Sequence, residues 1–346
     1  MIGTLEEIER SFNSSLDSIL TYIDMFERTL ALDFSQMKKS KFYSNLNLKK
    51  NEINTSLSLT KNVQYNAVII SLYGAFELTI KKAVNAYIFK CISSNRDVAS
   101  NFKKNYLLSV AKSFERNNEI TNNNLLASLN KLFNYNDATG FNEDYSLNNV
   151  QNVKTNVIQE VASLIGINDI LTTIKQADEF VEFIMSRERF ENKEQAQEYL
   201  NTINNPFSHI DEIVDRRNKI AHEGREENML AKSIIKESYI PEFKVFIHIY
   251  IKLIKIKWLE FECCESNKLS IIKIFDGKVI CFNTGNRIIK GNDIILIKMG
   301  SDLKIANIVS MQFNNANIDI SETHQDIGCK LDKKCKPNYE YFIIQL

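Results

Sequence analysis

The stretch Asp215-Arg216-Arg217-Asn218-Lys219-Ile220-Ala221-His222-Glu223-Gly224 decides how the rest of the chain is interpreted. Apolar Ile210, Ile213 and Ala221 recur at helical spacing around it, which predicts an amphipathic helix. Asn205-Pro206 marks the start of that helix, and Gly224 is well suited to end it in the left-handed conformation. The stretch therefore predicts a helix whose last turns carry two arginines, an amide and a histidine.

Arg217, Asn218 and His222 together are suited to cleaving RNA without a metal. That reaction needs a base for the ribose 2′-hydroxyl, donors that hold the phosphate as it gains charge, and an acid for the leaving 5′-oxygen. Histidine suits the acid and base roles because its pKa lies near neutrality. Arginine offers a planar, permanently charged fork for phosphate oxygens. The asparagine is suited to orient the histidine or to donate to the phosphate.

The spacing of these residues limits what one copy can do. Asn218 and His222 are four apart and share a helix face. Arg217 and His222 are five apart, about 140° round the helix. Asp215 lies on the side of His222, where it is interpreted as orienting the imidazole. A single histidine is half of what acid–base catalysis requires, so the spacing favours a homodimer in which two copies of the motif face each other.

The string Arg217-Asn-Lys-Ile-Ala-His222, followed by Glu223-Gly224, resembles the signature of the HEPN superfamily. The resemblance implies a helical bundle, dimerisation through the motif helices and metal-independent endoribonuclease activity with no cofactor. Members of the superfamily act largely in toxin–antitoxin and antiviral defence systems, which implies RNA and an antitoxin or defence-system protein as partners. By matching position, Arg217 and His222 are the catalytic residues and Asn218 is their polar companion.

The string Leu72-Tyr73-Gly74-Ala75-Phe76-Glu77 places one carboxylate in an apolar, aromatic helix predicted over about 59–93. An isolated buried carboxylate is costly unless it has a partner. Two interpretations stay open: Glu77 faces solvent, or it meets the Arg217 guanidinium across the bundle. MAE-type and related prokaryotic HEPN families, to which this region is similar, often carry Tyr and Glu at about this place, so Glu77 is expected to have a supporting role.

The remaining pattern divides the chain into two domains of different class. Helical periodicity runs from a first helix over about 4–33 to a last helical region that ends near Phe261, with a polar connection over about 35–59. From about Ser266 the runs are short and β-branched, and Asp276-Gly277 is a hairpin signal. The fold class expected is α+β, with an all-α HEPN-like domain over 1–265 and a small β-barrel over 266–346.

Three segments of the C-terminal domain resemble the second, barrel domain of translational GTPases: Ile289 to Ile297, Lys304 to Gln312 and Asp326 to Leu331. No phosphate-binding G-x-x-x-x-G-K-[ST] motif accompanies them. The resemblance implies a barrel that directs the nuclease to tRNA, ribosomal RNA or a partner. Lys330, Lys333, Lys334 and Lys336 form one basic run, which is interpreted either as part of that contact or as a solvated turn.

Composition excludes several other classes. Lys plus Arg equals Asp plus Glu at 43 each, so RNA must be bound by local patches rather than by bulk charge. The six cysteines include no C-x-x-C pair, which favours reduced thiols in a cytoplasmic protein. A zinc site from Cys329, Cys335 and His324 matches no common spacing, and no metal is expected. Lysines interrupt the most apolar stretch, Phe243 to Phe261, so no membrane contact is expected.

Two alternatives to the nuclease remain open from the sequence. The first is a non-catalytic helical scaffold that binds RNA or a protein partner, with the barrel as its docking module. An antitoxin-like or sensor subunit is the second alternative. Because Arg217 and His222 are both intact, the sequence favours the nuclease.

Overall fold

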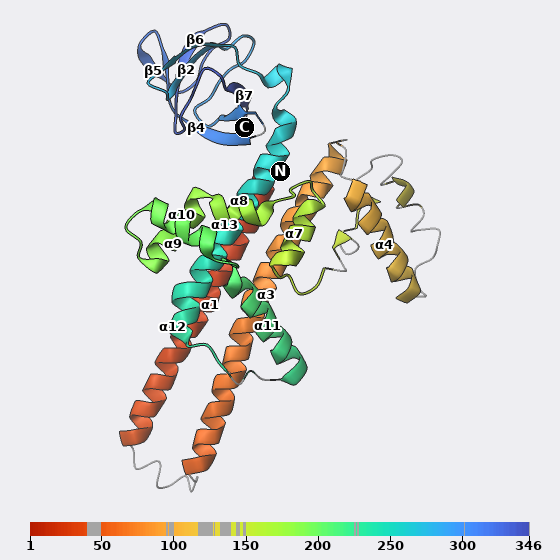
Figure 1. Ribbon diagram of the computed structural model, residues 1–346, viewed down its shortest axis with the longest axis vertical. Helices are drawn as coiled ribbons and strands as arrows, with labels where there is room; N and C mark the ends of the chain where they lie inside the picture. Colours follow the sequence, from red (N-terminus) through yellow and green to blue (C-terminus); the bar gives the residue numbers. More distant parts are fainter. Residues whose placement is uncertain are drawn as a thin grey trace. The chain divides into compact units, whose positions relative to one another are not determined.

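The structure is a computed structural model, which describes residues 1–39, 50–94, 96, 100–116, 127, 129–131, 140–142, 146–147, 150–224, 226, 228–300 and 302–345 (Figure 1). Its internal contacts divide the chain into two compact units, Met1–Leu253 and Ile254–Leu346. The first is helical and the second is dominated by β-strands. The α+β class expected from the sequence is therefore confirmed.

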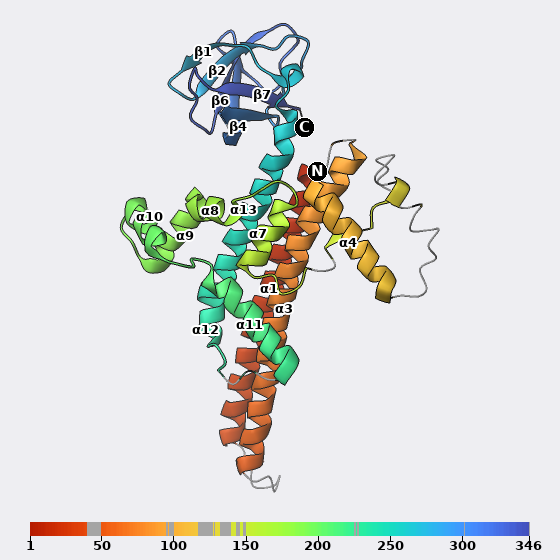
Figure 2. The same ribbon diagram turned by 45° about the vertical axis from the view of Figure 1, so that its right-hand side comes forward.

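Two long helices form the frame of the first unit: α1 (Ile2–Lys39) and α3 (Lys50–Ser93). They lie side by side in both views (Figures 1 and 2). The apolar face predicted for the first helix is buried, as are the positions of α3 that face it. Both helices extend further into the expected polar connection than the periodicity indicated, and residues 40–49 lie outside the described part of the chain. Helix formation is cooperative, so a helix that has formed can continue into a polar flank.

The last helical region packs against this frame. It comprises α12 (Lys232–Ile234), a π-helical turn η2 (Ile235–Tyr239) and α13 (Ile240–Leu259). Phe243 and Phe246 of α13 contact the ring of Phe76 on α3 at centroid distances of 4.8 and 5.8 Å. A helix is expected to kink or restart at a proline. Here the π turn ends at Tyr239, two positions before Pro241, which has no N–H to continue the hydrogen-bond pattern of the turn.

Shorter helices complete the first unit: α4 (Ser100–Arg116), α7 (Thr155–Ser163), α8 (Ile170–Gln176), α9 (Asp178–Glu188), α10 (Lys193–Thr202) and α11 (Ser208–Glu223). The Asn192 side chain caps α10 by accepting the N–H of Gln195 at 2.9 Å, as the sequence predicts. The loop expected over 135–152 lies largely outside the described residues. Of all these helices, α11 carries the sequence motif.

The second unit is a seven-stranded antiparallel sheet. After 3-10 turns at Glu260–Glu262 and Glu265–Asn267, its strands are β1 (Ile271–Phe275), β2 (Val279–Asn283), β3 (Ile294–Met299), β4 (Asp302–Phe313), β5 (Ala316–Ile318), β6 (Asp326–Leu331) and β7 (Glu340–Ile344). The order is β1-β2-β6-β4-β3-β7, with β5 paired to β4. The hairpin predicted at Asp276-Gly277 is confirmed between β1 and β2.

The sheet curls around one apolar core and forms a half-barrel. Inward positions alternate along the strands, as in Ile280 and Phe282 of β2 and Ile327 and Cys329 of β6, all of them buried. Within the described residues β1 and β7 do not pair as a ladder; the segment before β1 meets β7 at an isolated bridge between Lys268 and Phe342. The expected barrel is thus observed as a curled antiparallel sheet.

None of the described helices is long and apolar enough to cross a membrane. The six cysteines are free thiols. Among the described residues no group of three or more His, Cys, Asp or Glu side chains is arranged to hold a metal ion.

Candidate functional site

The motif occupies the second half of α11 and ends where the sequence predicts. Gly224 adopts φ 76°, and its N–H donates to the carbonyl of Ile220 at 2.9 Å. A glycine suits this left-handed position because it has no Cβ to clash. Asn66 of α3 also fixes this end, since its Nδ2 donates to the carbonyl of Gly224 at 3.0 Å. The C-terminus of the motif helix is therefore attached to α3.

Arg217 lies against α3 without a carboxylate partner. Its guanidinium sits 4.9 Å from the centroid of the Tyr73 ring, in a cation–π arrangement. Its Nη1 donates to Oδ1 of Asn218 at 3.0 Å. The side chain is half-buried, and within the described part of the chain it forms no ion pair. The guanidinium is thus held in place while its charge stays available for an anion.

Glu77 does not meet Arg217, as one interpretation of the sequence had it. Its Oε1 pairs with Lys81, one turn further along α3, at 2.6 Å. Tyr73 lies between the two groups, with its ring under the guanidinium of Arg217. Burial and the hydrogen bond to Glu77 raise the pKa of Tyr73 to about 12. The physical reason is local: a lysine four residues away on the same helix satisfies the carboxylate, and Glu77 reaches Arg217 only through the tyrosine.

Asp215 does not orient His222 in this structure. Its Oδ1 pairs with Nζ of Lys154 at 2.6 Å, and the aspartate is largely exposed. Asp215 and His222 lie seven residues apart on one face of α11, as the spacing predicts. The carboxylate of Asp215 nevertheless pairs with Lys154, the residue that precedes α7. No local pattern predicts this partner, because Lys154 lies 61 positions earlier in the chain.

His222 is the one histidine of the first unit that is free for chemistry. His209 binds Oε2 of the buried Glu242 through Nδ1 at 2.7 Å, and His248 binds Oε1 of Glu9 at 2.7 Å. His222 lies exposed in the last turn of α11. It makes no hydrogen bond or ion pair with any residue the structure describes.

Arg216, next to Arg217, has the opposite environment. Its Nε and Nη2 donate to Oε1 of Glu212 at 2.8 and 2.6 Å, and its Nη1 donates to the Tyr65 hydroxyl at 3.0 Å. Glu212 also accepts a short hydrogen bond from Tyr239 of the π turn. Burial alone would raise the pKa of Glu212, but these hydrogen bonds outweigh it and lower the pKa. Arg216 is therefore a structural arginine. Its difference from the neighbouring Arg217 cannot be predicted from the sequence.

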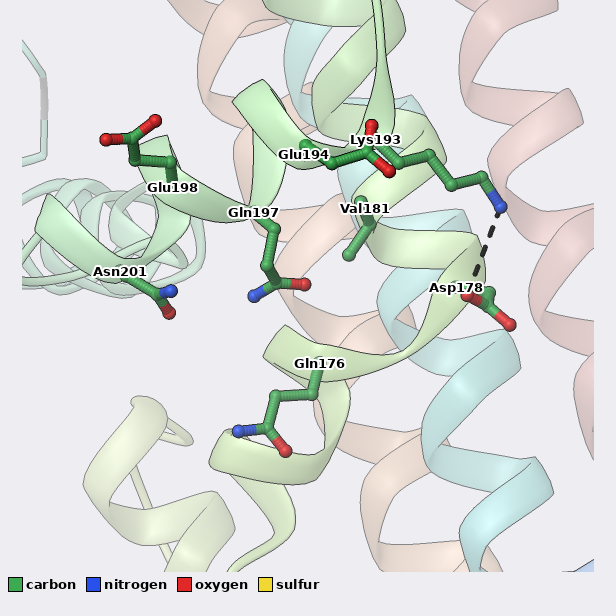
Figure 3. A pocket seen from close by; sticks show the side chains of 8 residues that line it. All are labelled: Gln176, Asp178, Val181, Lys193, Glu194, Gln197, Glu198 and Asn201. Atoms are coloured by element: carbon green, nitrogen blue, oxygen red, sulfur yellow. Dashed lines mark ion pairs between the residues drawn. The ribbon is translucent and has the colours of Figure 1, made fainter.

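Two open recesses of about 480 Å³ lie in the first unit, and neither contains Arg217 or His222. One is formed by α8, α9 and α10 (Figure 3) and is lined by amides and charged groups such as Gln176, Gln197 and Asn201. There Lys193 faces Asp178 across 3.9 Å. The other follows α11 and carries four carboxylates against Arg216 and Lys219, a balance that disfavours phosphate. The motif is therefore an exposed helix end rather than a closed cavity.

Comparison with known proteins supports the interpretation of this helix. A family model described as RiboL-PSP-HEPN matches residues 40–255, a range that includes α3, α11 and nearly all of α13. A search of curated proteins found no match.

Proposed function

Because the chain belongs to the RiboL-PSP-HEPN family, we propose that it is a metal-independent endoribonuclease that cleaves RNA by attack of the ribose 2′-hydroxyl. HEPN domains are associated with RNA cleavage and RNA binding. One observation carries the proposal. Arg217 and His222 keep their cationic and acid–base groups free of carboxylates, whereas Arg216, His209 and His248 do not.

The roles follow from the chemistry of each group. One histidine takes the proton of the 2′-hydroxyl, and the 2′-oxygen attacks the phosphorus. The bond to the 5′-oxygen breaks, and a second histidine protonates that leaving oxygen. Arg217 binds the phosphate oxygens as their charge grows, and Asn218 holds Arg217 through its Oδ1. The products are a 2′,3′-cyclic phosphate and a 5′-hydroxyl.

One chain supplies only one of the two histidines, so the proposal includes a homodimer. Arg217 is turned toward α3 and His222 toward solvent, which leaves each copy with half of a site. In the dimer the two motif helices face each other, and each composite site has an acid, a base and two arginines. Glu77 supports Arg217 indirectly through Tyr73, and Asp215 steadies the start of the motif through Lys154.

The biological setting we propose is defence against viruses or a toxin–antitoxin pair, with the nuclease as effector in the cytoplasm. The substrate is tRNA or ribosomal RNA, and an antitoxin or another defence-system protein restrains the enzyme. The curled sheet, whose sequence resembles the second domain of translational GTPases, directs the nuclease to that RNA. Its exposed lysines 330, 333, 334 and 336 support an RNA contact there.

The direct test is cleavage of total tRNA by the purified protein in EDTA. We expect cleavage that leaves 2′,3′-cyclic phosphate ends, and we expect His222→Ala to reduce it by about 10²- to 10⁴-fold, the usual contribution of a general acid or base. His248→Ala is the matched control, since His248 is also on the surface but bonded to Glu9. Equal cleavage by the wild type and His222→Ala would count against the proposal.

A second candidate is a non-catalytic RNA-binding scaffold or sensor. The divergence of Arg217 and His222 within one chain favours it, because a monomer so arranged binds a phosphate without completing a cleavage site. It predicts that Arg217→Ala weakens RNA binding, and that neither the wild type nor this variant cleaves RNA. The same tRNA experiment distinguishes the two functions.

A further inference from the structure

The outward face of the curled sheet carries an exposed aromatic ring beside lysines. Strands β1, β2 and β6 lie next to one another there (Figure 2). In the register of the sheet, Phe275 of β1 faces Val279 of β2, and Val279 faces Lys330 of β6. Directly paired residues lie on the same face of an antiparallel sheet, and the next pair, Ile280 and Cys329, is buried in the core. Phe275 and Lys330 therefore point outward, and Phe275 is 45% exposed.

A second outward row runs beside the first. Lys273 of β1 faces Cys281 of β2, and Cys281 faces Gly328 of β6. The Nζ of Lys273 lies 4.6 Å from the centroid of the Phe275 ring. A Cβ on Gly328 would lie 3.6 Å from Sγ of Cys281 and 3.7 Å from Cγ1 of Val279, which is ordinary contact. The packing of the described residues therefore does not require a glycine, and a glycine inside a strand often marks a place where a ligand approaches the backbone.

Further lysines gather at the end of this face where the β1–β2 hairpin turns. The carbonyl of Lys278 in the hairpin accepts the N–H of Leu331, and the carbonyl of Gly277 accepts the N–H of Cys335. The turn that follows β6 therefore passes beside the hairpin and brings its exposed lysines there. We call the resulting surface the basic face, and it consists of Phe275 with Lys273, Lys278, Lys330, Lys333 and Lys334.

The positive charge of the basic face is not neutralised within the unit. Among the described residues none of its five lysines forms an ion pair, whereas Lys268 of the same unit pairs with two glutamates. Two carboxylates belong to the same turns, Asp276 and Asp332, and Asp332 accepts from the N–H and the Nδ2 of Asn307 at 2.9 Å each. The basic face thus carries an excess of positive charge on a chain whose net charge is zero.

An exposed aromatic ring among unpaired lysines suits a single strand of RNA. Unpaired bases stack on aromatic side chains, and positively charged groups follow the phosphates between them. Stacking of this kind tolerates any base, because every base has a π face. The bases of a duplex remain stacked on one another, so a duplex would meet the lysines and leave the ring unused.

We propose that the basic face binds an unpaired stretch of RNA without regard to its base sequence, with one base stacked on Phe275. Lys273 and Lys330 contact the phosphates on either side of that base, and the lysines at the hairpin end contact the strand beyond it. The missing side chain at Gly328 lets the strand lie close to the sheet. The proposal deepens the nuclease function by naming the form of RNA that the second unit selects. It rests on that function only for the choice of RNA, and binding is independent of cleavage.

Fluorescence anisotropy with a labelled oligouridylate tests the role of the ring. All proteins are full length and carry Arg217→Ala and His222→Ala, so that neither cleavage nor phosphate binding at α11 contributes. Phe275→Leu should raise the Kd by about 5- to 100-fold, as expected for the loss of one stacked base, and Phe275→Tyr should bind as the parent does. Phe275 is not among the core residues of the unit, so far-UV circular dichroism should be unchanged. Equal binding by the parent and Phe275→Leu would overturn the proposal.

The salt dependence of binding tests the lysines. Lys330→Gln should lower the slope of log Kd against log salt concentration by about 0.7, the contribution of one phosphate contact to a single strand. Lys304→Gln is the matched control, because Lys304 is also exposed but lies in the part of β4 that pairs with β3 rather than with β6. Equal changes of slope in both variants would show binding by overall charge and would contradict the proposal.

Competition distinguishes unpaired RNA from other polyanions. Unlabelled oligouridylate should displace the probe, and an RNA duplex of the same length or polyglutamate should do so only at much higher concentration. Displacement by polyglutamate as efficient as that by oligouridylate would assign the basic face to an acidic protein. Equally efficient displacement by the duplex would show that the strand form is not selected. Either result would overturn the proposal.

The outcomes separate the basic face from the nuclease. Binding of oligouridylate that depends on Phe275, with no RNA cleavage by the wild type, retains the basic face and removes the nuclease function. Cleavage by the wild type, with binding that Phe275→Leu leaves unchanged, retains the nuclease and removes the basic face.

Discussion

The two parts of α11, Ser208–Arg216 (the first half) and Arg217–Glu223 (the second half), carry similar side chains in opposite environments. In the first half, polar groups are bonded to one another: Arg216 to Glu212, Glu212 to Tyr239, and His209 to the buried Glu242. In the second half Lys219 still pairs with Glu226, but Arg217 lies against an aromatic ring, and His222 makes no hydrogen bond or ion pair with any residue that the structure describes. Residue type alone does not distinguish structural arginines and histidines from functional ones. The distinction depends on whether a carboxylate lies within hydrogen-bonding distance of the side chain.

The network of bonded side chains in the first half of α11 includes residues of neighbouring helices. Glu242 of α13 is fully buried, and its Oε2 accepts from Nη1 of Arg187 at 2.8 Å as well as contacting His209. The His209 ring stacks on the Tyr239 ring at a centroid distance of 4.2 Å. The π turn positions Tyr239 between His209 and Glu212. The network thus fixes the rotation of α11, and with it the direction of the motif.

The largest effect is expected from breaking this network at Arg187. Arg187→Ala should lower the free energy of unfolding by about 3–5 kcal/mol, because it removes one of the two side chains that hold the buried carboxylate of Glu242. His222→Ala should change it by less than about 0.5 kcal/mol, as expected of an exposed residue without contacts. Urea unfolding of both variants measures the difference. Equal stability losses would mean that the two halves of α11 do not differ in this way.

A smaller effect is expected on catalysis from the ring beneath Arg217. Tyr73→Leu removes a cation–π contact worth about 0.5–2 kcal/mol, so kcat/KM for RNA cleavage should fall by about 2- to 30-fold. Tyr73→Phe keeps the ring and loses only the hydroxyl that accepts the N–H of Val153, and it should retain activity. The measurement is made well below the unfolding temperature of each variant.

The control for Tyr73 is the comparison between the two substitutions. Rescue of kcat/KM by phenylalanine but not leucine identifies Tyr73 as a positioning residue for Arg217. If both variants lose activity equally, the hydroxyl and its link to Glu77 matter more than the ring. If both lose activity in proportion to their loss of stability, Tyr73 is a packing residue only.

Much of this architecture follows from sequence patterns that are local. The motif helix, its Gly224 end, the Asn192 cap and the Asp276-Gly277 hairpin depend on a few neighbouring residues, and each was predictable. The α+β class follows from the change in periodicity near Ser266. The lengths of α1 and α3 were underestimated because the sequence at their ends is polar and shows little helical periodicity.

The partners within the site could not be predicted because they come from distant parts of the chain. Tyr73 lies in a string that the sequence singled out, but its role under Arg217 depends on how α11 crosses α3. Lys81 was a visible i,i+4 partner for Glu77 and gave a usable signal. Lys154, which pairs with Asp215, gave none. Spacing thus predicts which residues share a face, whereas pairing across helices requires the fold.

The smallest effect expected is a pH dependence of stability confined to the first half of α11. Hydrogen bonds from Tyr239 and Arg216 outweigh burial and lower the pKa of Glu212 below its ordinary value of 4.5. A carboxylate with a lowered folded-state pKa contributes stability that is present above the unfolded-state pKa and is lost as pH falls through the folded-state pKa. The stabilisation from Glu212 should therefore be complete at pH 7 and should be lost progressively as the pH falls below the ordinary carboxyl range.

Glu212→Gln tests this sign directly. The variant should be less stable than the wild type at pH 7, and the difference should shrink as the pH is lowered past the ordinary carboxyl range. Tyr239→Phe, which removes one of the two donors to Glu212, should act in the same direction and by less, since Arg216 remains. Chemical denaturation at pH 7 and at pH 3.5 measures both. If the stability difference between the wild type and Glu212→Gln grew on acidification, the charged form of Glu212 would be destabilising in the folded state. The first half of α11 would then be held in place by packing rather than by these hydrogen bonds.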